Sequence, residues 1–254
     1  MTAPGVEQQQ TTVLRDAENP HRSSTQKLYS PRDAISWPRK SAKMVRGSWR
    51  QLRKIPRRLQ SFRALKKLGI IDYFRDYPPD AIRPRYDDLF GLYLITMRRR
   101  PAVILELGGG YSTFVFAHAV RELFLQNNQI AFYSVDESDY WQRVVKNHLP
   151  HELLPFVHFW RSDPELIEMN GELVSTFGSL PLTAANLVYV DGGLVPGNRI
   201  GADALVLECE APIDYAVLID NRKRTVDFLK RNLTKPYVIG RGPTGSQTLF
   251  ARAV

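Results

Sequence analysis

VILELGGGYSTFVFA, residues 103–117, is the stretch that determines the fold of this chain. Residues 103–105 are apolar without alternation, which is typical of a strand covered on both faces of a parallel sheet. An acid and three consecutive glycines then end the strand. Beyond them Ser112 or Thr113 can cap a helix, because apolar residues recur three to five positions apart from Phe114 onward. The stretch therefore predicts a strand, a tight glycine turn and a helix N-terminus, an arrangement in which a ligand can approach the backbone closely.

The length and composition fit one α/β domain with an extension. The 254 residues carry a net charge of +9. Cys209 is the only cysteine, which excludes an intramolecular disulfide framework and a cysteine-based zinc cluster. Neither the first twenty residues nor any later run has the apolar length that a signal peptide or a spanning helix requires. We therefore expect a cytoplasmic protein, either soluble or peripheral to the inner face of a membrane.

Basic residues are concentrated in the N-terminal part of the chain. Residues 1–100 hold 22 Lys and Arg against 9 Asp and Glu, whereas residues 101–254 hold 13 against 17. Residues 1–38 are polar with little periodicity and predict a disordered arm. Residues 39–67 contain twelve Lys or Arg and no acid.

This basic stretch also has apolar residues at helical spacing. Pro56 would break an interior turn, so we expect two helices, near 42–54 and 57–68. One interpretation is an amphipathic module, residues 39–68, that lies on an anionic membrane surface or on nucleic acid. The other is a pair of helices packed on the core with a solvated basic face.

From residue 101 onward strands and helices alternate, which predicts crossover connections and a parallel sheet. The strands are expected at 102–107, 130–135, 155–160, 186–190 and 214–219. The helices between and after them are expected at 112–126, 139–149, 164–176, 199–210 and 222–232. YVIGR and QTLFARAV, joined by a GPTGS turn, predict a closing antiparallel hairpin. With a further helix at 84–100, residues 81–254 form one domain, and residues 1–80 hold the arm and the basic helices.

Ligands of such a sheet bind outside the carboxyl ends of its strands, and polar residues follow the predicted strands there. They are glycines 108–110, the pairs Asp136-Glu137, Ser162-Asp163 and Asp220-Asn221, and Asp191 with two glycines. Asp136 suits a pair of ribose hydroxyls, because a carboxylate accepts both protons. Glu137 stays open as the alternative, since 26 residues separate Gly110 from Asp136, more than the roughly 20 of the dinucleotide fingerprint.

The glycine turn distinguishes between cofactors. It reads Gly108-x-Gly110-x-x-Thr113 and so lacks the third glycine of the dinucleotide fingerprint. Glu106 precedes the turn, and its carboxylate would repel a pyrophosphate but attract a cationic amino-acid ligand. This combination favours S-adenosylmethionine, which carries a sulfonium and an ammonium group, over NAD.

LELGGGYST, with SVDES at the second strand, LVYVDGG at the fourth and the terminal hairpin, resembles the class I S-adenosylmethionine-dependent methyltransferases over about residues 84–254. The resemblance implies a Rossmann-like, doubly wound α/β fold with a basic helical N-terminal extension. Its mostly parallel seven-stranded sheet has the order 3-2-1-4-5-7-6, with strand seven antiparallel.

The resemblance also implies site residues. The positions that match the family are Glu106, Gly108 and Gly110 at the methionine end of the cofactor, Asp136 at the ribose, Asp163 where adenine is often met, and Asp191 near the transferred methyl group. Asp163 has another interpretation, because it can begin a helix with Pro164 at its first position.

Asp191 together with Asp220 and Asn221 resembles the divalent-metal site of catechol-type O-methyltransferases. Such oxygen ligands suit Mg²⁺, which would lower the pKa of a bound hydroxyl. The lysine that this family places shortly after its first metal acid is absent, since residues 194–195 are Leu-Val. The alternative is that Asp220 and Asn221 cap the following helix.

These observations predict an enzyme that transfers a methyl group from S-adenosylmethionine to an oxygen or nitrogen of an acceptor, with Asp191 as the catalytic candidate. The basic N-terminal helices favour a glycan or lipid-linked acceptor, with RNA as the second option. The main alternative is a non-catalytic nucleotide-binding, membrane-associated or RNA-associated scaffold with a degenerate site. An NAD-dependent enzyme is the other.

Overall fold

The strands that the sequence predicts after residue 101 build one sheet. The computed structural model describes residues 55–79, 81–181, 184–244 and 246–253. The strands of the sheet are β1 (Val103–Leu107), β2 (Ala131–Asp136), β3 (His158–Arg161), β6 (Leu187–Val190), β7 (Ala216–Ile219), β8 (Tyr237–Arg241) and β9 (Thr248–Arg252). The arm expected over residues 1–38 and the helix expected near 42–54 lie outside the described residues.

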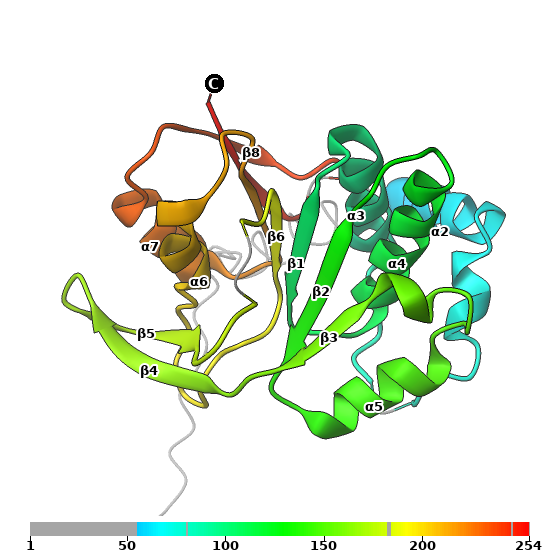
Figure 1. The fold of residues 1–254 in the computed structure, drawn as a ribbon, viewed down its shortest axis with the longest axis horizontal. Helices are drawn as coiled ribbons and strands as arrows, with labels where there is room; N and C mark the ends of the chain where they lie inside the picture. The colour runs from blue at the N-terminus through cyan, green and yellow to red at the C-terminus, as the bar shows by residue number, and fades with distance from the viewer. Residues whose placement is uncertain (1–54, 80, 182–183, 245, 254) are drawn as a thin grey trace, which may run out of the picture. The chain divides into compact units, whose positions relative to one another are not determined.

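The strand order is β3-β2-β1-β6-β7-β9-β8 (Figure 1). The first five of these strands pair in parallel, and β9 is antiparallel to both β7 and β8. Counted along the chain within this sheet, the order is 3-2-1-4-5-7-6 with the seventh strand antiparallel, so the expected fold class is confirmed. In this register Leu107 lies opposite both Val135 and Val190, and the residues after β2, β1 and β6 therefore emerge side by side.

Helices cover both faces of the sheet because its central strands are apolar on both sides. On one face lie α2 (Ile55–Lys67), the 3₁₀ helix η1 (Ile70–Phe74), α3 (Tyr86–Arg99), α4 (Tyr111–Phe124) and α5 (Asp139–His148) (Figure 1). On the other lie α6 (Asp203–Val206), the 3₁₀ helix η3 (Leu207–Glu210) and α7 (Lys223–Asn232). Successive side chains of β1 point to opposite faces of the sheet. Ile104 packs in the core under α4, and Leu105 packs in the core under α7.

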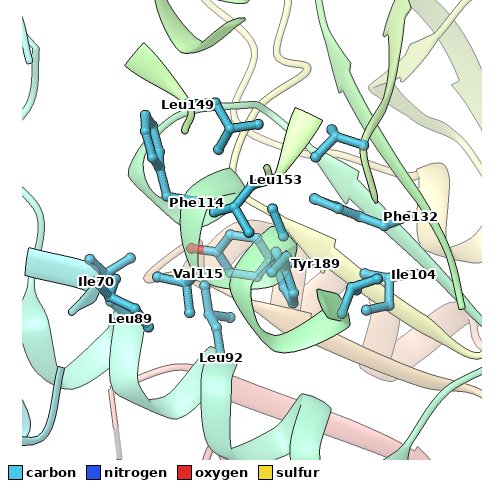
Figure 2. Packing of buried hydrophobic residues seen from close by; sticks show 14 of the residues in the cluster. Ile70, Leu89, Leu92, Ile104, Phe114, Val115, Phe132, Leu149, Leu153 and Tyr189 are labelled. Carbon is cyan, nitrogen blue, oxygen red and sulfur yellow. The ribbon is translucent and has the colours of Figure 1, made fainter. Parts of the chain in front are cut away.

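The core on the α4 side holds the glycine turn in place. Figure 2 shows Phe114 and Val115 of α4 packed with Leu92 of α3, Ile104 of β1 and Tyr189 of β6, and each of these is at most 3% exposed. Burying a side chain of this size contributes roughly 1.5–3 kcal/mol relative to leaving it exposed. The apolar spacing that predicts α4 is therefore the stripe that faces the sheet, and it anchors both elements that flank the turn.

The helix expected at 57–68 is confirmed as α2. It begins at Ile55 with Pro56 in its first turn, where the missing N–H breaks no hydrogen bond. Leu65 is fully buried, and the ring of Phe62 lies 5.0 Å from that of Tyr86 at the start of α3. The basic side chains of this helix are exposed, namely Arg57, Arg58, Arg63, Lys66 and Lys67. Within α2 the apolar stripe therefore packs on the core and the basic face meets solvent.

The prediction of a helix over residues 164–176 is wrong. A separate antiparallel pair stands there instead, made of β4 (Pro164–Met169) and β5 (Glu172–Phe177). Asn170 and Gly171 connect the strands with φ values of 53° and 76°, the conformation that a two-residue hairpin turn requires. The Asn-Gly pair is the stronger local signal, and it outweighs the helical spacing.

Two further elements are shorter than expected. The helix expected at 199–210 is reduced to α6 and η3, because the backbone of residues 200–202 bonds to Ser175 of β5. β3 begins only at His158, since residues 154–156 form the 3₁₀ helix η2 (Leu154–Phe156) around Pro155. No helix in the described ranges is long and apolar enough to cross a membrane.

Candidate functional site

A cavity of about 510 Å³ lies at the carboxyl edge of β1, β2, β6 and β7, within the range of roughly 300–1,000 Å³ for small-ligand sites. Residues at the ends of these strands form one wall, and the segment from Tyr77 to Leu89 forms the other. Its functional lining residues are Tyr77, Arg83, Arg85, Asp88, Gly108, Gly110, Asp136, Glu137, Tyr189, Asp191, Asp220 and Arg222. Of the residues predicted from sequence, the cavity thus brings together both outer glycines, both candidate ribose acids, Asp191 and Asp220.

The glycine turn after β1 packs backbone against backbone on the turn after β6. Gly108 has a φ of 98°, and a Cβ there would lie 2.4 Å from the nitrogen of Gly192. Gly192 donates its N–H to the Leu107 carbonyl at 2.6 Å. Both positions therefore require glycine, because any side chain would separate the two turns.

Helix α4 starts at the cavity wall. Gly110 occupies its N-cap position, and Thr113 Oγ1 accepts the N–H of Gly110 at 3.1 Å, so the cap lies earlier than the predicted Ser112 or Thr113. A Cβ at Gly110 would meet no heavy atom of the described residues within 4 Å. The N-terminus of α4, including Tyr111, thus borders an open space, and its helix dipole makes this a favourable place for an anionic group.

Glu106 lies behind the turn and not at the cavity surface. It is fully buried, and its Oε2 accepts hydrogen bonds from the hydroxyls of Thr113 at 2.6 Å and Ser134 at 2.7 Å. Its Oε1 has no hydrogen-bond partner in the described part of the chain. Burial raises the pKa of Glu106 to about 7, although the hydroxyl hydrogen bonds oppose the shift. Glu106 therefore supports the turn from beneath by joining β1, β2 and α4.

Both candidate ribose acids reach the cavity. Asp136 Oδ2 accepts the N–H of Gly109 at 2.8 Å, and its Oδ1 accepts that of Ser138 at 2.7 Å. Burial raises the pKa of Asp136 to about 6, against the effect of these two hydrogen bonds. Glu137 Oε2 is buried without a hydrogen-bond partner among the described residues. Asp136 thus holds the glycine turn as well as lining the cavity, whereas Glu137 keeps an acceptor that no described side chain or N–H uses.

Asp191 lines the cavity between Tyr189 and Arg222. The Arg222 guanidinium donates to the backbone carbonyl of Asp191 and lies 3.8 Å from its Oδ1, while the Tyr189 hydroxyl lies 3.4 Å from its Oδ2. The side chain is 43% exposed, into the cavity. Desolvation by the cavity walls and repulsion from Asp220 raise the pKa of Asp191 to about 6, against the attraction of Arg222.

Asp220 lines the cavity after β7, but Asn221 does not. In the described residues no group of three or more His, Cys, Asp or Glu side chains could hold a metal ion, so the expected Mg²⁺ site receives no support. The capping alternative receives none either. Arg222 occupies the N-cap of α7, and it makes no side-chain cap hydrogen bond.

Asp163 lies apart from the other predicted residues. Its side chain is 76% exposed, forms a 2.6 Å ion pair with Arg161 and is not part of the cavity lining. Strand β4, and no helix, follows it at Pro164. The structure therefore supports neither the adenine position nor the helix start for this residue.

The segment before α3 supplies cavity residues that sequence reasoning missed. Asp88 is 5% exposed and lies 3.0 Å from Arg85 Nε, while Arg85 also bonds Asp87 at 3.2 Å. Burial raises the pKa of Asp88 to about 7, against the attraction of Arg85. In the sequence the two acids look like first-turn residues that complement the helix dipole. The sequence contains one local sign that the residues before α3 run as extended chain over the strand ends. This sign is the set of prolines at 78, 79 and 84, which favour extended backbone.

Comparisons with known proteins agree with this architecture. No protein-family model matches the chain, and no curated protein matches its sequence. The methyltransferase PaMTH1 of Podospora anserina, solved with S-adenosylhomocysteine bound, is 12% identical and covers 87% of this chain and 99% of its own, with a TM-score of 0.52. The O-methyltransferase TomG of Streptomyces achromogenes, solved with S-adenosylmethionine, is 16% identical over 75% of this chain and 89% of its own, with a TM-score of 0.44. The strand order and the first of these similarities show that the chain has the fold of the class I S-adenosylmethionine-dependent methyltransferases.

Proposed function

We propose that this protein binds S-adenosylmethionine in the cavity and transfers its methyl group to an oxygen or nitrogen atom of an acceptor. The observation that carries the proposal is the glycine turn after β1, packed on Gly192 and opening at Gly110 toward a cavity lined by carboxylates. The S-adenosylhomocysteine bound to the Podospora anserina enzyme of the same fold supports it.

The residues present fit this cofactor in shape and in charge. Close packing of Gly108 on Gly192 leaves no side chain between the turn and the cavity, and the N-terminus of α4 suits the carboxylate of an amino acid. Carboxylates around the cavity favour a ligand with sulfonium and ammonium groups, and they disfavour a pyrophosphate.

Asp136 and Glu137 together are the proposed ribose acids. Each oxygen of Asp136 already accepts one N–H, but a carboxylate offers about four acceptor sites, so it can accept a hydroxyl as well. Glu137 Oε2 has no partner among the described residues and supplies a second acceptor. A diol across these two side chains would satisfy an oxygen whose burial is otherwise unfavourable.

When bound, the cofactor supplies a methyl group on a sulfonium, which an acceptor atom displaces in line. The contribution of the protein is proximity, orientation and the exclusion of water. Asp191 and Tyr189 lie where the turn after β6 meets the glycine turn, and they provide hydrogen-bonding groups that orient an acceptor beside the methyl donor.

Calorimetric titration tests the proposal directly. We expect selective binding of S-adenosylmethionine with NAD as the control ligand, and a loss of about tenfold or more in Asp136→Asn, where one oxygen acceptor is removed. Asp139→Asn is the matched control, because its side chain is 72% exposed and lies outside the cavity lining. Binding of NAD alone, or of neither ligand, would refute the proposal and favour the non-catalytic scaffold. Unchanged affinity in Asp136→Asn would remove that residue from the site.

The basic segment of residues 39–68 is proposed to bring the enzyme to an anionic surface. Support comes from the exposed basic side chains of α2, of which only Arg58 lies within ion-pair distance of a described acid, 3.8 Å from Asp87. Leu65 packs in the core, so α2 contributes charge and not an apolar face for insertion into a bilayer.

A further inference from the structure

The cavity wall formed by α3, β6 and β7 contains acids that the cofactor does not require. Asp88 comes from the first turn of α3, Asp191 from the end of β6 and Asp220 from the end of β7. If the cofactor lies over the glycine turn as proposed above, this wall remains for the acceptor. The inference below therefore rests on the proposed function.

Asp88 and Asp220 have buried oxygens without hydrogen bonds. Both oxygens of Asp88 and Oδ1 of Asp220 are inaccessible to solvent and find no hydrogen-bond partner within the described ranges. Arg85 Nε lies 3.0 Å from Asp88 Oδ2, but its direction is not that of a hydrogen bond, so the contact is a charge pair only. Buried acceptors of this kind are costly and are normally paired, which indicates that a ligand with hydrogen-bond donors belongs here.

Gln247 extends the same cluster from the neighbouring strand. Ile219 pairs with Thr248, so Asp220 and Gln247 are the next residues at the same end of β7 and β9. Gln247 is 1% exposed, and neither atom of its amide has a hydrogen-bond partner in the described part of the protein. Asp88 and Asp220 thus bring unpaired polar groups into the cavity lining from two elements, and Gln247 adds a third unpaired group next to Asp220 along the sheet, outside the lining.

The guanidinium groups of this wall are already engaged. Arg85 pairs with Asp87 and Asp88, and Arg222 contacts Asp191. No basic nitrogen of the described residues lies within 4.0 Å of the Asp220 carboxylate oxygens, so Asp220 forms no ion pair there. At this wall an anionic acceptor would therefore meet the unpaired carboxylate of Asp220 and guanidiniums that already pair with carboxylates. Arg83, the third guanidinium of the lining, lies on the segment before α3 and not on this wall.

The charge around the cavity favours a cationic acceptor. Among the described lining residues five carboxylates stand against three guanidiniums. S-adenosylmethionine, with one net positive charge, offsets only part of the difference. The excess negative charge lies around Tyr189. Burial raises the pKa of its phenol well above 10, and so do four nearby carboxylates, those of Asp191, Asp220, Glu106 and Asp88.

We infer that the acceptor is an amine, held as its ammonium ion by Asp88 and Asp220 at the β7 end of the cavity. Before transfer one N–H proton passes to the Asp220 carboxylate. The freed electron pair of the nitrogen then bonds to the methyl carbon as the bond from that carbon to sulfur breaks, and S-adenosylhomocysteine leaves. An ammonium group donates three hydrogen bonds and carries the charge that the wall lacks. A hydroxyl can fill the same acceptors but leaves the carboxylates repelling one another. A carboxylate or phosphate adds to that repulsion.

The test compares ligands that differ only in charge. The protein is saturated with S-adenosylhomocysteine, and tyramine, its neutral analogue 2-(4-hydroxyphenyl)ethanol and the anion 4-hydroxyphenylacetate are titrated by calorimetry. Hexylamine, hexanol and hexanoate form a second series without an aromatic ring. We expect each amine to bind about tenfold or more tightly than its neutral partner. Equal binding, preference for the alcohol or the acid, or no amine binding in either series overturns the inference.

Variants locate the site. Asp220→Asn and Asp88→Asn should each weaken amine binding about tenfold while changing the affinity for S-adenosylhomocysteine less than about twofold. Asp227→Asn, an acid on the exposed part of α7 that pairs with Lys223, is the control. If both cavity variants keep folded far-ultraviolet spectra and full amine affinity, the assignment is wrong.

The two proposals fail separately. Loss of S-adenosylhomocysteine binding refutes the proposed function, and the amine series is then run on the ligand-free protein. Amine binding that still depends on Asp220 would uphold the acidic site without the methyl donor. Cofactor binding without amine preference would uphold the methyltransferase and reject the acceptor class.

Discussion

At the scale of single residues, Gly108 shows how the fold makes room for a ligand. Its Cα faces the backbone of Gly192 so closely that the turns after β1 and β6 touch without side chains. Gly110, two residues on, faces open space. The same three-glycine run therefore has one residue required by packing and one that borders the cavity.

Gly108→Ala should destabilise the protein by about 2–4 kcal/mol. The new Cβ would lie 2.4 Å from the Gly192 nitrogen, and φ at this position is 98°, so the roughly 1–3 kcal/mol of overpacking adds to roughly 1 kcal/mol of backbone strain. Urea unfolding midpoints measure the effect. Gly110→Ala is the control, because its Cβ meets none of the described atoms within 4 Å. Equal midpoints for the two variants would show that the turns can separate without cost.

Glu106 should make stability depend on pH. The pKa of Glu106 is about 7 in the folded protein, above its ordinary value of 4.5, so the folded state holds the proton more tightly than the unfolded state. The stabilisation is complete below about pH 4.5 and is lost as pH rises through 7. At roughly 1.4 kcal/mol per pKa unit the loss is on the order of 3 kcal/mol.

Glu106→Gln removes this titration while keeping the shape of the side chain. Urea unfolding at pH 5 and pH 8 should show a smaller decrease in the free energy of unfolding for the variant than for the wild type. Other carboxylates with raised pKa values contribute equally to both proteins, so the difference reports Glu106. Parallel pH profiles would show that Glu106 is ionised in the folded protein at both pH values.

At the scale of elements, the β4–β5 hairpin replaces an expected crossover helix. The turn depends on Asn170 and Gly171, both with positive φ. Apolar residues in 164–176 recur at helical spacing, but the two-residue turn that Asn170 and Gly171 favour decided the structure. Ser175 of β5 also forms backbone hydrogen bonds with Ile200 and Ala202, and this pairing leaves only the short helix α6 after residue 202.

Gly171→Ala should therefore weaken the hairpin by about 1 kcal/mol, the cost of a left-handed conformation for a residue with a Cβ. Its φ is 76°, and no described atom lies within 4 Å of the added methyl group, so the effect is purely conformational. Amide hydrogen exchange of β4 and β5 should accelerate while that of β1 does not. Gly240→Ala in β8 is the control, because Gly240 also faces open space but without a positive φ. Faster exchange in both variants, or in neither, would contradict the role of the turn.

At the scale of the whole molecule, the charge of residues 1–54 differs from that of residues 55–254. Residues 1–54 carry 11 Lys and Arg against 4 Asp and Glu, whereas residues 55–254 carry 24 against 22. Residues 55–254 are nearly balanced in charge and include every residue that lines the cavity. Association with an anionic surface and binding of the methyl donor should therefore be separable.

Deletion of residues 1–54 should weaken sedimentation with anionic vesicles and leave S-adenosylmethionine affinity unchanged. Binding of the full chain should fall steeply between low and high salt, because exposed charges are screened within about 10 Å at 0.1 M ionic strength. Neutral vesicles are the control lipid. The cut precedes α2, since Leu65 of that helix is part of the core. Undiminished sedimentation of the shortened protein would exclude residues 39–54 from the membrane contact and leave α2 or a later element as the contact.

Much of this architecture could be predicted from local pattern. The apolar run before Gly108, the spacing after Gly110 and the alternation beyond residue 101 each record a burial pattern, and burial pattern determines the type of element. Together with the resemblance they give the sheet order. Asp136 and Asp191 could be found as well, because a residue at the carboxyl end of a parallel strand must emerge at the ligand edge.

The tertiary structure alone decided which side chains share the cavity. Asp88 looks like a helix-dipole acid in the sequence, yet it is buried beside Arg85 across from the end of β7. Glu106 precedes the glycine turn as predicted but points beneath it, toward Thr113 and Ser134. A sequence records the period of an element and the residues at its ends. The segment that covers a strand end, and the direction of a side chain beside a turn, depend on packing between residues far apart in the chain.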